Sequence, residues 1–513
     1  MPKMRAAGLV AVGALVALPG VGYAGGRLLN DSAWTNQGLR ALDAAKKLDD
    51  AARGPARERA KNVILFVGDG MGISTLTAAR ILEGQKHGQP GEENQLAFEK
   101  FPHLALVKTY SVNQQTSDSA PTMTAMVTGV KTKDGVLSID ENVVRGDHTT
   151  VKGHELTTLL ELAEDRGLST GVVSTARLTH ATPGACYAHS PERDWESDAE
   201  LSEAARAAGF PDIARQLLEN SHGDGLEVAL GGGRSYFLPE TVQDPEDAGA
   251  TGRRKDGRDL TLAWQQKRHG AYVWNKQQFD AIDPKRTERL LGLFERSHME
   301  YEADRAKDAG GEPSLAEMTA KAIALLGKND KGFVLMVEAG RIDHAHHAGN
   351  ARRALEDTIA LSDAVKLAAA HTDARDTQII VTADHSHVFT IAGYPARGND
   401  ILGKVVSLDV HGEVDDAYSL DSHELPYTTL GYTNGPGHRE EGRPDLTQID
   451  TGALDYLQEA TVPLSAETHA GEDVALYARG PSAHLVHGNQ EQTLSFYVAA
   501  HALGFDAAHE GAR

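Results

Sequence analysis

The chain has 513 residues, a formal net charge of −22 and a single cysteine, Cys186. This length can bury one large core or two smaller ones, and a lone cysteine excludes an internal disulfide. The acidic balance argues against nucleic acids and anionic membranes as partners, and an anionic substrate would need cations at its binding site.

Residues 1–24 have the features of a secretory signal peptide. Lys3 and Arg5 precede an apolar run over residues 6–18, and small residues follow. A membrane anchor is the alternative, but this run is shorter than the roughly 20 residues that a spanning helix needs. We therefore expect export to the periplasm or the extracellular space, with no membrane-spanning segment in the mature chain. Residues 25–60 are expected to form a helical arm.

The first predicted strand covers residues 62–67, which are almost entirely apolar and therefore indicate burial on both faces. It is followed by Asp69 between glycines, which allow the backbone to approach a ligand closely. Asp69 is thus a candidate metal ligand, and a tight turn without a ligand is the alternative. Ser74 is expected to cap the helix that follows.

Ser119 lies at the start of the next predicted helix, in the stretch TSDSAP. Pro121 is tolerated in a first helical turn. At a helix N-terminus the dipole and the free N–H groups favour an alkoxide or a bound phosphate. The alternative is that Ser119 is only the N-cap.

A helix over residues 155–166 precedes the strand predicted at residues 170–174, which leads to Thr182 and then Arg193. Arg193 is either an ordinary surface charge or a bidentate clamp for phosphate. Residues 240–310 are polar and irregular and predict no element.

A capping box formed by Ser314 and Glu317 opens the next helix. The strand predicted at residues 333–337 then ends at Glu338. Asp343 and His347 are four residues apart, so a helix would place them on one face as two ligands of one metal. A His-rich surface loop is the alternative.

A helix over residues 351–371 leads to a fourth strand at residues 377–382, which ends in Asp384 and His385. Buried strands that alternate with helices indicate a largely parallel α/β sheet. Ligands of such sheets bind beyond the carboxyl ends of the strands, and these ends carry the candidate ligands. Residues 393–464 are rich in Gly, Pro, Tyr and Asp and are predicted to be an insertion between residues 61–392 and 465–513.

The motifs VGDGMG, SDSA, EAGRIDHAHH, TADHSH and ETHAGEDVALYARGPSAHLVHG occur in this order through nearly all of residues 60–503. Together they resemble the alkaline phosphatase family. The resemblance implies a three-layer sandwich with a large, mostly parallel central sheet, and a homodimer. It implies hydrolysis of small phosphate monoesters with two zinc ions and one magnesium ion. The insertion resembles the crown domain of the animal enzymes.

The resemblance also implies the roles of single residues. It assigns Asp343, His347 and His469 to a first zinc, and Asp384, His385 and one oxygen of Asp69 to a second zinc, which also contacts the nucleophile Ser119. The other oxygen of Asp69, with Thr182 and Glu338, is assigned to magnesium. Arg193 is assigned to the substrate phosphate, whose negative charge it neutralises together with the metals.

Two further features are similar to the animal-like branch of the family. His180 and His344 stand beside the metal ligands where the enterobacterial branch has Asp and Lys. Phe294, Glu295 and Glu312 match part of an additional calcium or magnesium site. The chain departs from the family pattern at Pro121 and in lacking disulfides.

Other functions agree less well with the sequence. A sulfatase would need a modified Cys or Ser in its own signature, which is absent, and a phosphodiesterase usually lacks a segment like residues 180–193. A non-catalytic exported protein that binds phosphate or zinc would need no nucleophile, so Ser119 at a helix start counts against it.

Overall fold

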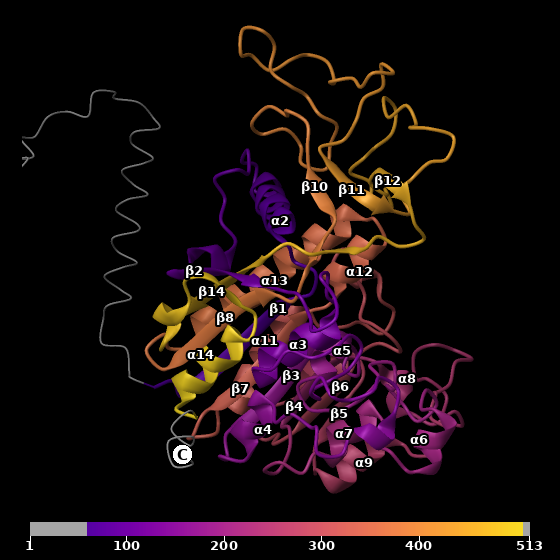
Figure 1. Ribbon diagram of the computed structural model, residues 1–513, viewed down its shortest axis with the longest axis vertical. Coiled ribbons are helices and arrows are strands. Elements are labelled where there is room, and N and C mark those ends of the chain that lie inside the picture. The colour runs from indigo at the N-terminus through magenta and orange to yellow at the C-terminus, as the bar shows by residue number, and fades with distance from the viewer. Residues whose placement is uncertain (1–58, 506–513) are drawn as a thin grey trace, which may run out of the picture. The chain divides into compact units, whose positions relative to one another are not determined.

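The computed structural model describes residues 59–505, and a ten-stranded sheet forms their centre (Figure 1). The strands lie in the order β15 (Gly488–Glu491), β2 (His103–Lys108), β14 (Val474–Arg479), β8 (Thr377–Ala383), β1 (Asn62–Gly68), β7 (Phe333–Ala339), β3 (Ser169–Arg177), β4 (Val228–Gly232), β6 (Leu290–Leu293) and β5 (Ala271–Val273). Only β14 runs antiparallel to its neighbours. The predicted fold class, a mostly parallel α/β sheet, is confirmed.

The four strands predicted from apolar runs are the four adjacent strands β8, β1, β7 and β3. Nearly every residue in them is buried, because helices cover both faces of the sheet (Figure 1). One group of helices comprises α2 (Ile73–Lys86), α11 (Leu315–Leu326) and α13 (Ala351–His371), and the other comprises α3 (Ser119–Thr128), α4 (Leu159–Glu164), α5 (Ala181–Gly184) and α14 (Leu494–Leu503). Because β8, β1, β7 and β3 are parallel, their carboxyl ends lie at one edge of the sheet.

Helix boundaries follow local capping. Ser314 and Glu317 form the predicted capping box of α11, and α13 has the predicted bounds. The helix expected over residues 155–166 is shorter, because Glu155 pairs with Ile139 in a β-bridge and Thr158 becomes the N-cap of α4.

The expectation that Ser74 caps a helix is wrong. Helix α2 begins at Ile73, with Gly72 as its N-cap and no side-chain cap. Ser74 therefore lies inside the first turn, where its hydroxyl cannot cap the helix.

Residues 240–310 are more regular than their composition indicated. They contain α9 (Leu260–Lys267), α10 (Lys276–Ala281) and the strands β5 and β6, which extend the central sheet. These strands have only three and four residues, too few for a periodic pattern to stand out. The remaining short helices are α6 (Glu203–Ala207), α7 (Ile213–Glu219), α8 (Arg234–Phe237) and α12 (Arg341–His347).

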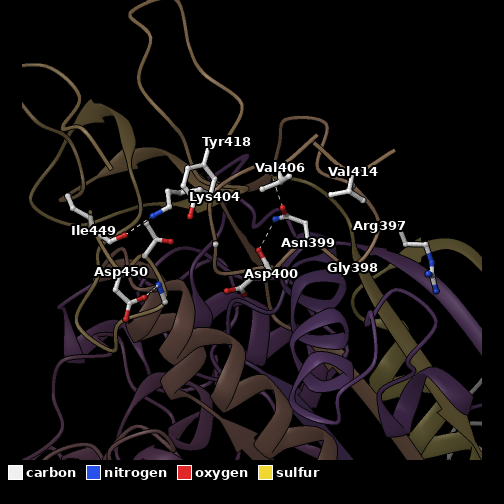
Figure 2. A pocket seen from close by; sticks show the side chains of 14 residues that line it. Arg397, Gly398, Asn399, Asp400, Lys404, Val406, Val414, Tyr418, Ile449 and Asp450 are labelled. Carbon is white, nitrogen blue, oxygen red and sulfur yellow. Dashed lines mark hydrogen bonds between the residues drawn. The ribbon is translucent and has the colours of Figure 1, made fainter. Parts of the chain in front are cut away.

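Residues 393–464, all within the described range, add no strand to the central sheet. They contribute β11 (Leu430–Gly435) and β12 (Ala460–Pro463), which join β10 (Phe389–Ile391) in a separate three-stranded sheet at the top of Figure 1. A pocket lies among their loops (Figure 2). Lys404 Nζ donates to the carbonyl oxygens of Leu446 and Ile449 at 3.0 and 2.9 Å, so it ties two of these loops together.

The two ends of this segment are joined by a short antiparallel pair of strands. β9 (Ser386–His387) pairs with β13 (His469–Ala470), and His469 lies opposite His387. The predicted signal peptide and nearly all of the predicted helical arm lie outside the described residues. Within residues 59–505 the structure has no helix long and apolar enough to cross a membrane.

Candidate active site

The carboxyl ends of the four central strands bring together the side chains that the sequence predicted there. Asp69 follows β1, Glu338 lies near the end of β7, Asp384 follows β8, and Thr182 lies in α5 after β3. All four residues have no solvent exposure. Buried carboxylates that lie close together repel one another unless a cation accompanies them.

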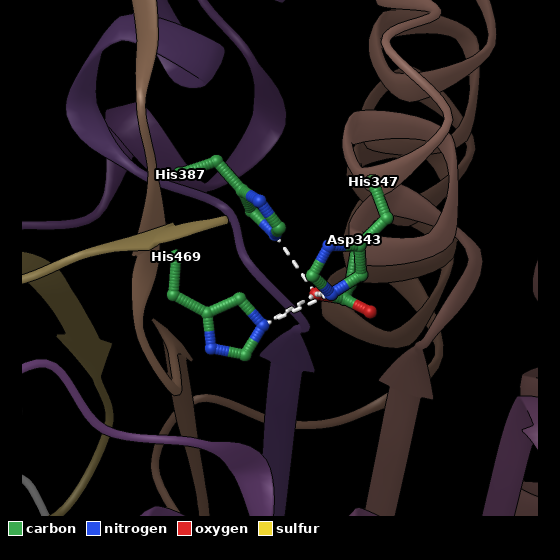
Figure 3. A group of neighbouring side chains, drawn as sticks. All are labelled: Asp343, His347, His387 and His469. Carbon is green, nitrogen blue, oxygen red and sulfur yellow. Dashed lines mark hydrogen bonds and ion pairs between the residues drawn. The ribbon is translucent and has the colours of Figure 1, made fainter. Parts of the chain in front are cut away.

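A second group of side chains surrounds Asp343 Oδ1 (Figure 3). His387 Nε2 lies 2.8 Å, His347 Nε2 3.2 Å and His469 Nε2 3.3 Å from this oxygen. Helix α12 places Asp343 and His347 on one face, as their spacing predicted, and the other two imidazoles come from β9 and β13.

The tautomers of His347 and His469 point to a cation between them. His347 Nδ1 donates to Glu467 O at 2.6 Å and His469 Nδ1 donates to Ser117 O at 2.8 Å. In the neutral rings each Nε2 therefore carries a lone pair, and the two Nε2 atoms lie only 3.1 Å apart. Two lone pairs at this distance repel unless a proton or a metal ion lies between them, and paired histidine ligands of zinc share a metal ion in this way.

His385 joins the two groups of ligands. Its Nε2 lies 3.2 Å from Asp384 Oδ2 and 3.5 Å from Asp69 Oδ1, and its ring stacks on that of His469 with 3.6 Å between ring centroids. The hydroxyl of Ser119 lies 3.4 Å from both Asp69 Oδ1 and His385 Nε2. All the predicted zinc ligands and the predicted nucleophile thus lie side by side.

Several buried polar atoms of this site have no hydrogen-bond partner among the described residues. They are Asp69 Oδ2, Thr182 Oγ1, Glu338 Oε1, Asp384 Oδ2 and His385 Nδ1. An unsatisfied buried polar atom is costly and requires an explanation. Bound metal ions would give these oxygen and nitrogen atoms their missing partners, so the residues present fit the predicted metals.

Burial and neighbouring charges shift the pKa values of the carboxyl groups in this site. Burial, together with neighbouring carboxylates, raises the pKa of Asp69 and Asp384, and burial raises the pKa of Glu338 to about 7. Burial also opposes ionisation of Asp343, yet the imidazoles led by His347 hold its pKa well below the usual range. A positive charge beside Asp69, Glu338 and Asp384 would stabilise their ionised forms.

Ser119 is the first residue of α3 and not its N-cap. Asp118 is the N-cap, and its carboxylate accepts the backbone N–H of Ser119 at 2.7 Å. The Ser119 hydroxyl is therefore not used as a cap. Arg193 pairs with the other oxygen of Asp118, and its second amino group lies 3.2 Å from His180 Nε2. Arg193 is thus held beside Ser119 and is not an ordinary surface charge.

Sequence reasoning missed three residues that hold these groups in place. Asp118 positions both Ser119 and Arg193. His387 bridges Asp343 and Glu467, whose Oε2 lies 2.6 Å from His387 Nδ1. Although burial opposes it, hydrogen bonds with Asp343 and Glu467 raise the pKa of His387 to about 10, so the protonated ring orients Asp343. Asp118, His387 and Glu467 lie inside the motifs SDSA, TADHSH and ETHAGED, and membership of these motifs was the signal that could have identified them.

The residues matched to an additional metal site, Phe294, Glu295 and Glu312, lie in the segment that follows β6. Burial raises the pKa of Glu295 to about 8 and of Glu312 to about 9, and each carboxylate is affected by another beside it. Glu246, which was not predicted, is the neighbour that raises the pKa of Glu295 most after burial. The Phe294 carbonyl accepts Arg234 Nη1 at 3.0 Å. Arg234 also pairs with Glu246 at 2.8 Å, so Glu295 and Glu312 are the carboxylates that could serve a hard cation, which prefers oxygen ligands.

Comparisons with known proteins agree with this geometry. The family model described as alkaline phosphatase matches residues 60–505. The tissue-nonspecific alkaline phosphatase of Gallus gallus is 45% identical over 93% of this chain and 90% of its own length. The alkaline phosphatase of Gadus morhua is 43% identical over 91% of this chain and 96% of its own.

Solved structures show the same fold. The alkaline phosphatase of Thermus thermophilus has a TM-score of 0.61 and 26% identity, and the comparison covers 88% of this chain and 94% of that one. The enzyme of the Antarctic bacterium TAB5 has a TM-score of 0.58 and 21% identity over 87% of this chain and 99% of that one. Family model, relatives, fold and site agree, and this chain, a phosphatase enzyme, belongs to the alkaline phosphatase family.

Proposed function

We propose that this phosphatase hydrolyses small phosphate monoesters to an alcohol and inorganic phosphate through a phosphoserine at Ser119, at a site for two zinc ions and one magnesium ion. The observation that carries the proposal is the contact between the His347 and His469 Nε2 atoms, 3.1 Å apart, next to buried oxygens without partners. The buried oxygens without partners are costly in the protein alone, and metal ions would give both them and the paired imidazoles a favourable partner.

The proposed ligands follow the chemistry of their atoms. Asp343, His347 and His469 would hold the first zinc. Asp384, His385 and one oxygen of Asp69 would hold the second, next to Ser119, because zinc binds imidazole and carboxylate. The other oxygen of Asp69, with Thr182 and Glu338, would hold magnesium, which prefers oxygen ligands. When bound, these ions lower the pKa of hydroxyl groups and stabilise negative charge on phosphoryl and alkoxide oxygens.

The chain's own residues perform the remaining work. Arg193, fixed by Asp118, donates to the oxygens of the substrate phosphate. Ser119 loses its hydroxyl proton to solvent, and its Oγ attacks phosphorus in line, so that the Oγ–P bond forms and the bond to the alcohol oxygen breaks. The alcohol takes a proton from water. A second water then breaks the Oγ–P bond, which releases phosphate and restores the Ser119 hydroxyl.

Further parts of the proposal rest on the sequence and on the relatives. We include a fourth cation, calcium or magnesium, held by Phe294, Glu295 and Glu312, with Glu246 beside them. His180 and His344 would tune the magnesium and phosphate sites from outside. The mature chain is proposed to be an exported homodimer in which residues 61–392 and 465–513 form the catalytic domain and residues 393–464 a crown-like insertion.

Turnover of p-nitrophenyl phosphate by the purified protein, together with elemental analysis, tests this proposal. We expect hydrolysis at alkaline pH, close to two zinc ions and one magnesium ion in the catalytic centre of each chain, and loss of activity after chelation. Preference for bis-p-nitrophenyl phosphate would indicate a diesterase instead. Phosphate binding without turnover would indicate a non-catalytic protein.

A further inference from the structure

Strand β11 lies within residues 393–464, outside the central sheet, yet two of its side chains reach the surroundings of the proposed first zinc site. They are Tyr432 and Asn434, which are two residues apart in the strand. Alternate residues of a strand lie on the same face. Each of the two side chains contacts the residue that immediately precedes a proposed ligand of this zinc.

Asn434 holds the residue before His469 through both ends of its amide group. Asn434 Nδ2 donates to Thr468 Oγ1 at 2.9 Å, and Asn434 Oδ1 accepts the backbone N–H of Thr468 at 3.0 Å. Two bonds from one planar amide hold the chain at Thr468 in both position and direction. His469 follows directly, and its Nδ1 donates to Ser117 O at 2.8 Å. The backbone before His469 and the ring of His469 are thus held separately.

Tyr432 holds the residue before His347. Its hydroxyl lies 2.8 Å from His346 Nδ1, and His346 Nε2 lies 2.9 Å from Thr75 Oγ1 in α2. The His346 side chain is completely buried, so loss of either hydroxyl would leave a ring nitrogen without a hydrogen bond, which is costly. His346 therefore anchors α12 between α2 and β11, one residue before His347.

The His346 ring also supports the group of side chains around Asp343. It stacks on the ring of His387, with 4.8 Å between the centroids and 29° between the planes. His387 Nε2 in turn lies 2.8 Å from Asp343 Oδ1 (Figure 3). Phe389 of β10 packs against His346 with 5.0 Å between the centroids. The sheet that contains β10 and β11 thus contacts, through His346, the imidazole that orients Asp343.

The distance between His347 and His469 decides whether one zinc ion can bind both. Two nitrogens on one tetrahedral zinc are about 3.4 Å apart, and the two Nε2 atoms lie 3.1 Å apart. Because the residues belong to different elements, α12 and β13, the local chain cannot set this distance. The backbone of Glu467 contacts His347, and β11 adds a contact next to each of the two ligands.

We propose that Tyr432 and Asn434 are positioning residues for the first zinc, so that a strand outside the central sheet takes part in building the catalytic centre. This inference rests on the proposed function. Neither side chain is a proposed ligand, and each acts through the residue that precedes one. Loss of either contact should therefore weaken zinc binding by about 10-fold, the lower end of the range for residues that support metal ligands from outside.

The test compares two variants at β11 with two matched controls. Tyr432→Phe removes only the buried hydroxyl, and Asn434→Ala removes both bonds to Thr468. Tyr418→Phe removes an exposed hydroxyl from the same segment. Asn399→Ala removes an amide that also bonds to the backbone through both of its ends. The controls thus cost the segment similar groups without altering a contact beside a proposed zinc ligand.

Zinc is measured after dialysis of the metal-loaded enzymes at a chelator concentration that leaves both zinc ions in the wild type. Tyr432→Phe and Asn434→Ala should lose one zinc ion per chain, whereas the two controls should keep both. Enzyme reloaded with cobalt gives a second readout, because the visible absorption of cobalt reports the geometry of its ligands. This spectrum should change in the two β11 variants even when cobalt is saturating.

A β11 variant that equals the wild type in zinc retention and in its cobalt spectrum overturns the inference for the residue concerned. Equal loss of zinc from all four variants overturns it for both residues, because general destabilisation of the segment would then be the cause. A wild type that holds no zinc would instead contradict the proposed two-zinc site, so the two failures can be distinguished.

Discussion

The hydroxyl of Ser119 lies 3.4 Å from both Asp69 Oδ1 and His385 Nε2, yet it is not required as a helix cap, because Asp118 fills that position. Replacing Ser119 with Ala should therefore leave the fold and the metal content unchanged while most turnover of p-nitrophenyl phosphate is lost. Attack by water on the bound ester leaves a small residual rate. Near-normal turnover would rule out a phosphoserine route.

Arg193 offers a planar guanidinium that Asp118 holds in one orientation. Lysine cannot form the same paired hydrogen bonds to phosphate. Arg193→Lys should lower kcat/KM by about 10- to 150-fold, which corresponds to the ~1.5–3 kcal/mol of a hydrogen bond to a charged group. The variant should also bind product phosphate more weakly, and an unchanged inhibition constant for phosphate would contradict the assignment.

His189 tests electrostatics away from the active site. Its Nε2 lies 2.9 Å from Glu161 Oε1, and although burial opposes it, this pairing raises the pKa of His189 above its ordinary value. Burial likewise opposes ionisation of Glu161, but His189 lowers its pKa, so the carboxylate stays charged. The folded state thus binds the imidazole proton more tightly than the unfolded state. The pair stabilises the protein fully below about pH 6.5, and the effect is lost as pH rises through the folded-state pKa.

His189→Gln should therefore lower the free energy of unfolding by about 1.5–3 kcal/mol at pH 6 and by less at pH 9. Urea denaturation of the metal-loaded enzyme at the two pH values measures this difference. The exposed change His411→Gln should show no such dependence. A larger loss at pH 9 would mean that His189 is neutral in its pair.

The turn between β1 and α2 helps to position the proposed zinc ligand Asp343. Gly70 has a φ of +69°, and a Cβ there would lie 2.3 Å from His387 Nε2. The His387 ring cannot give way easily, because it is buried and held by Asp343 and Glu467. Gly70→Ala should therefore displace His387, loosen Asp343 and lower the zinc content of the purified enzyme.

Gly88 is the matched control for this change. It has a similar φ of +73°, but within the described chain a Cβ there would meet nothing within 4 Å. Gly88→Ala carries the same left-handed backbone strain of about 1–2 kcal/mol and should keep its zinc and its activity. If both variants lose zinc equally, backbone strain alone is responsible and the contact with His387 is not important.

The elements also show where prediction from sequence succeeds and where it stops. The central strands could be predicted because strands covered on both faces read as unbroken apolar runs, as in residues 333–337. The strands β5 and β6, AYV and LLGL, are too short to carry such a signal. The ligand candidates could be found because parallel strands end at one edge. His387 could not be distinguished, because its role depends on Asp343 and Glu467, which are distant in sequence.

For the whole molecule, the metal-free state should have a characteristic pH dependence. Burial raises the folded-state pKa values of Asp69, Glu338 and Asp384, so the metal-free folded protein binds more protons than the unfolded chain. These three carboxyl groups therefore make the free energy of unfolding fall as pH rises. For Glu338 the fall begins near the ordinary carboxyl pKa and ends above its folded-state pKa of about 7. Each such carboxyl contributes at most about 1.4 kcal/mol per pH unit.

Chelated enzyme should accordingly lose unfolding free energy between pH 6 and pH 9, while the metal-loaded enzyme loses much less. The difference between the two forms is the useful quantity, because remote groups such as His189 affect both alike. Chemical denaturation of both forms at several pH values provides it. Parallel pH profiles would show that these carboxylates do not face the metals.

The pairing of β9 with β13 has a consequence for how such proteins diverge. His387 and His469 lie opposite each other in this pair, and residues 393–464 lie in the chain between its two strands. Exposed parts of the segment such as residues 410–418 can lengthen, shorten or be exchanged without altering the position of His469, whereas Asn434, which is hydrogen-bonded to Thr468, has to stay. Evolution can therefore change the outer surface that these exposed residues form while the proposed catalytic residues keep their positions.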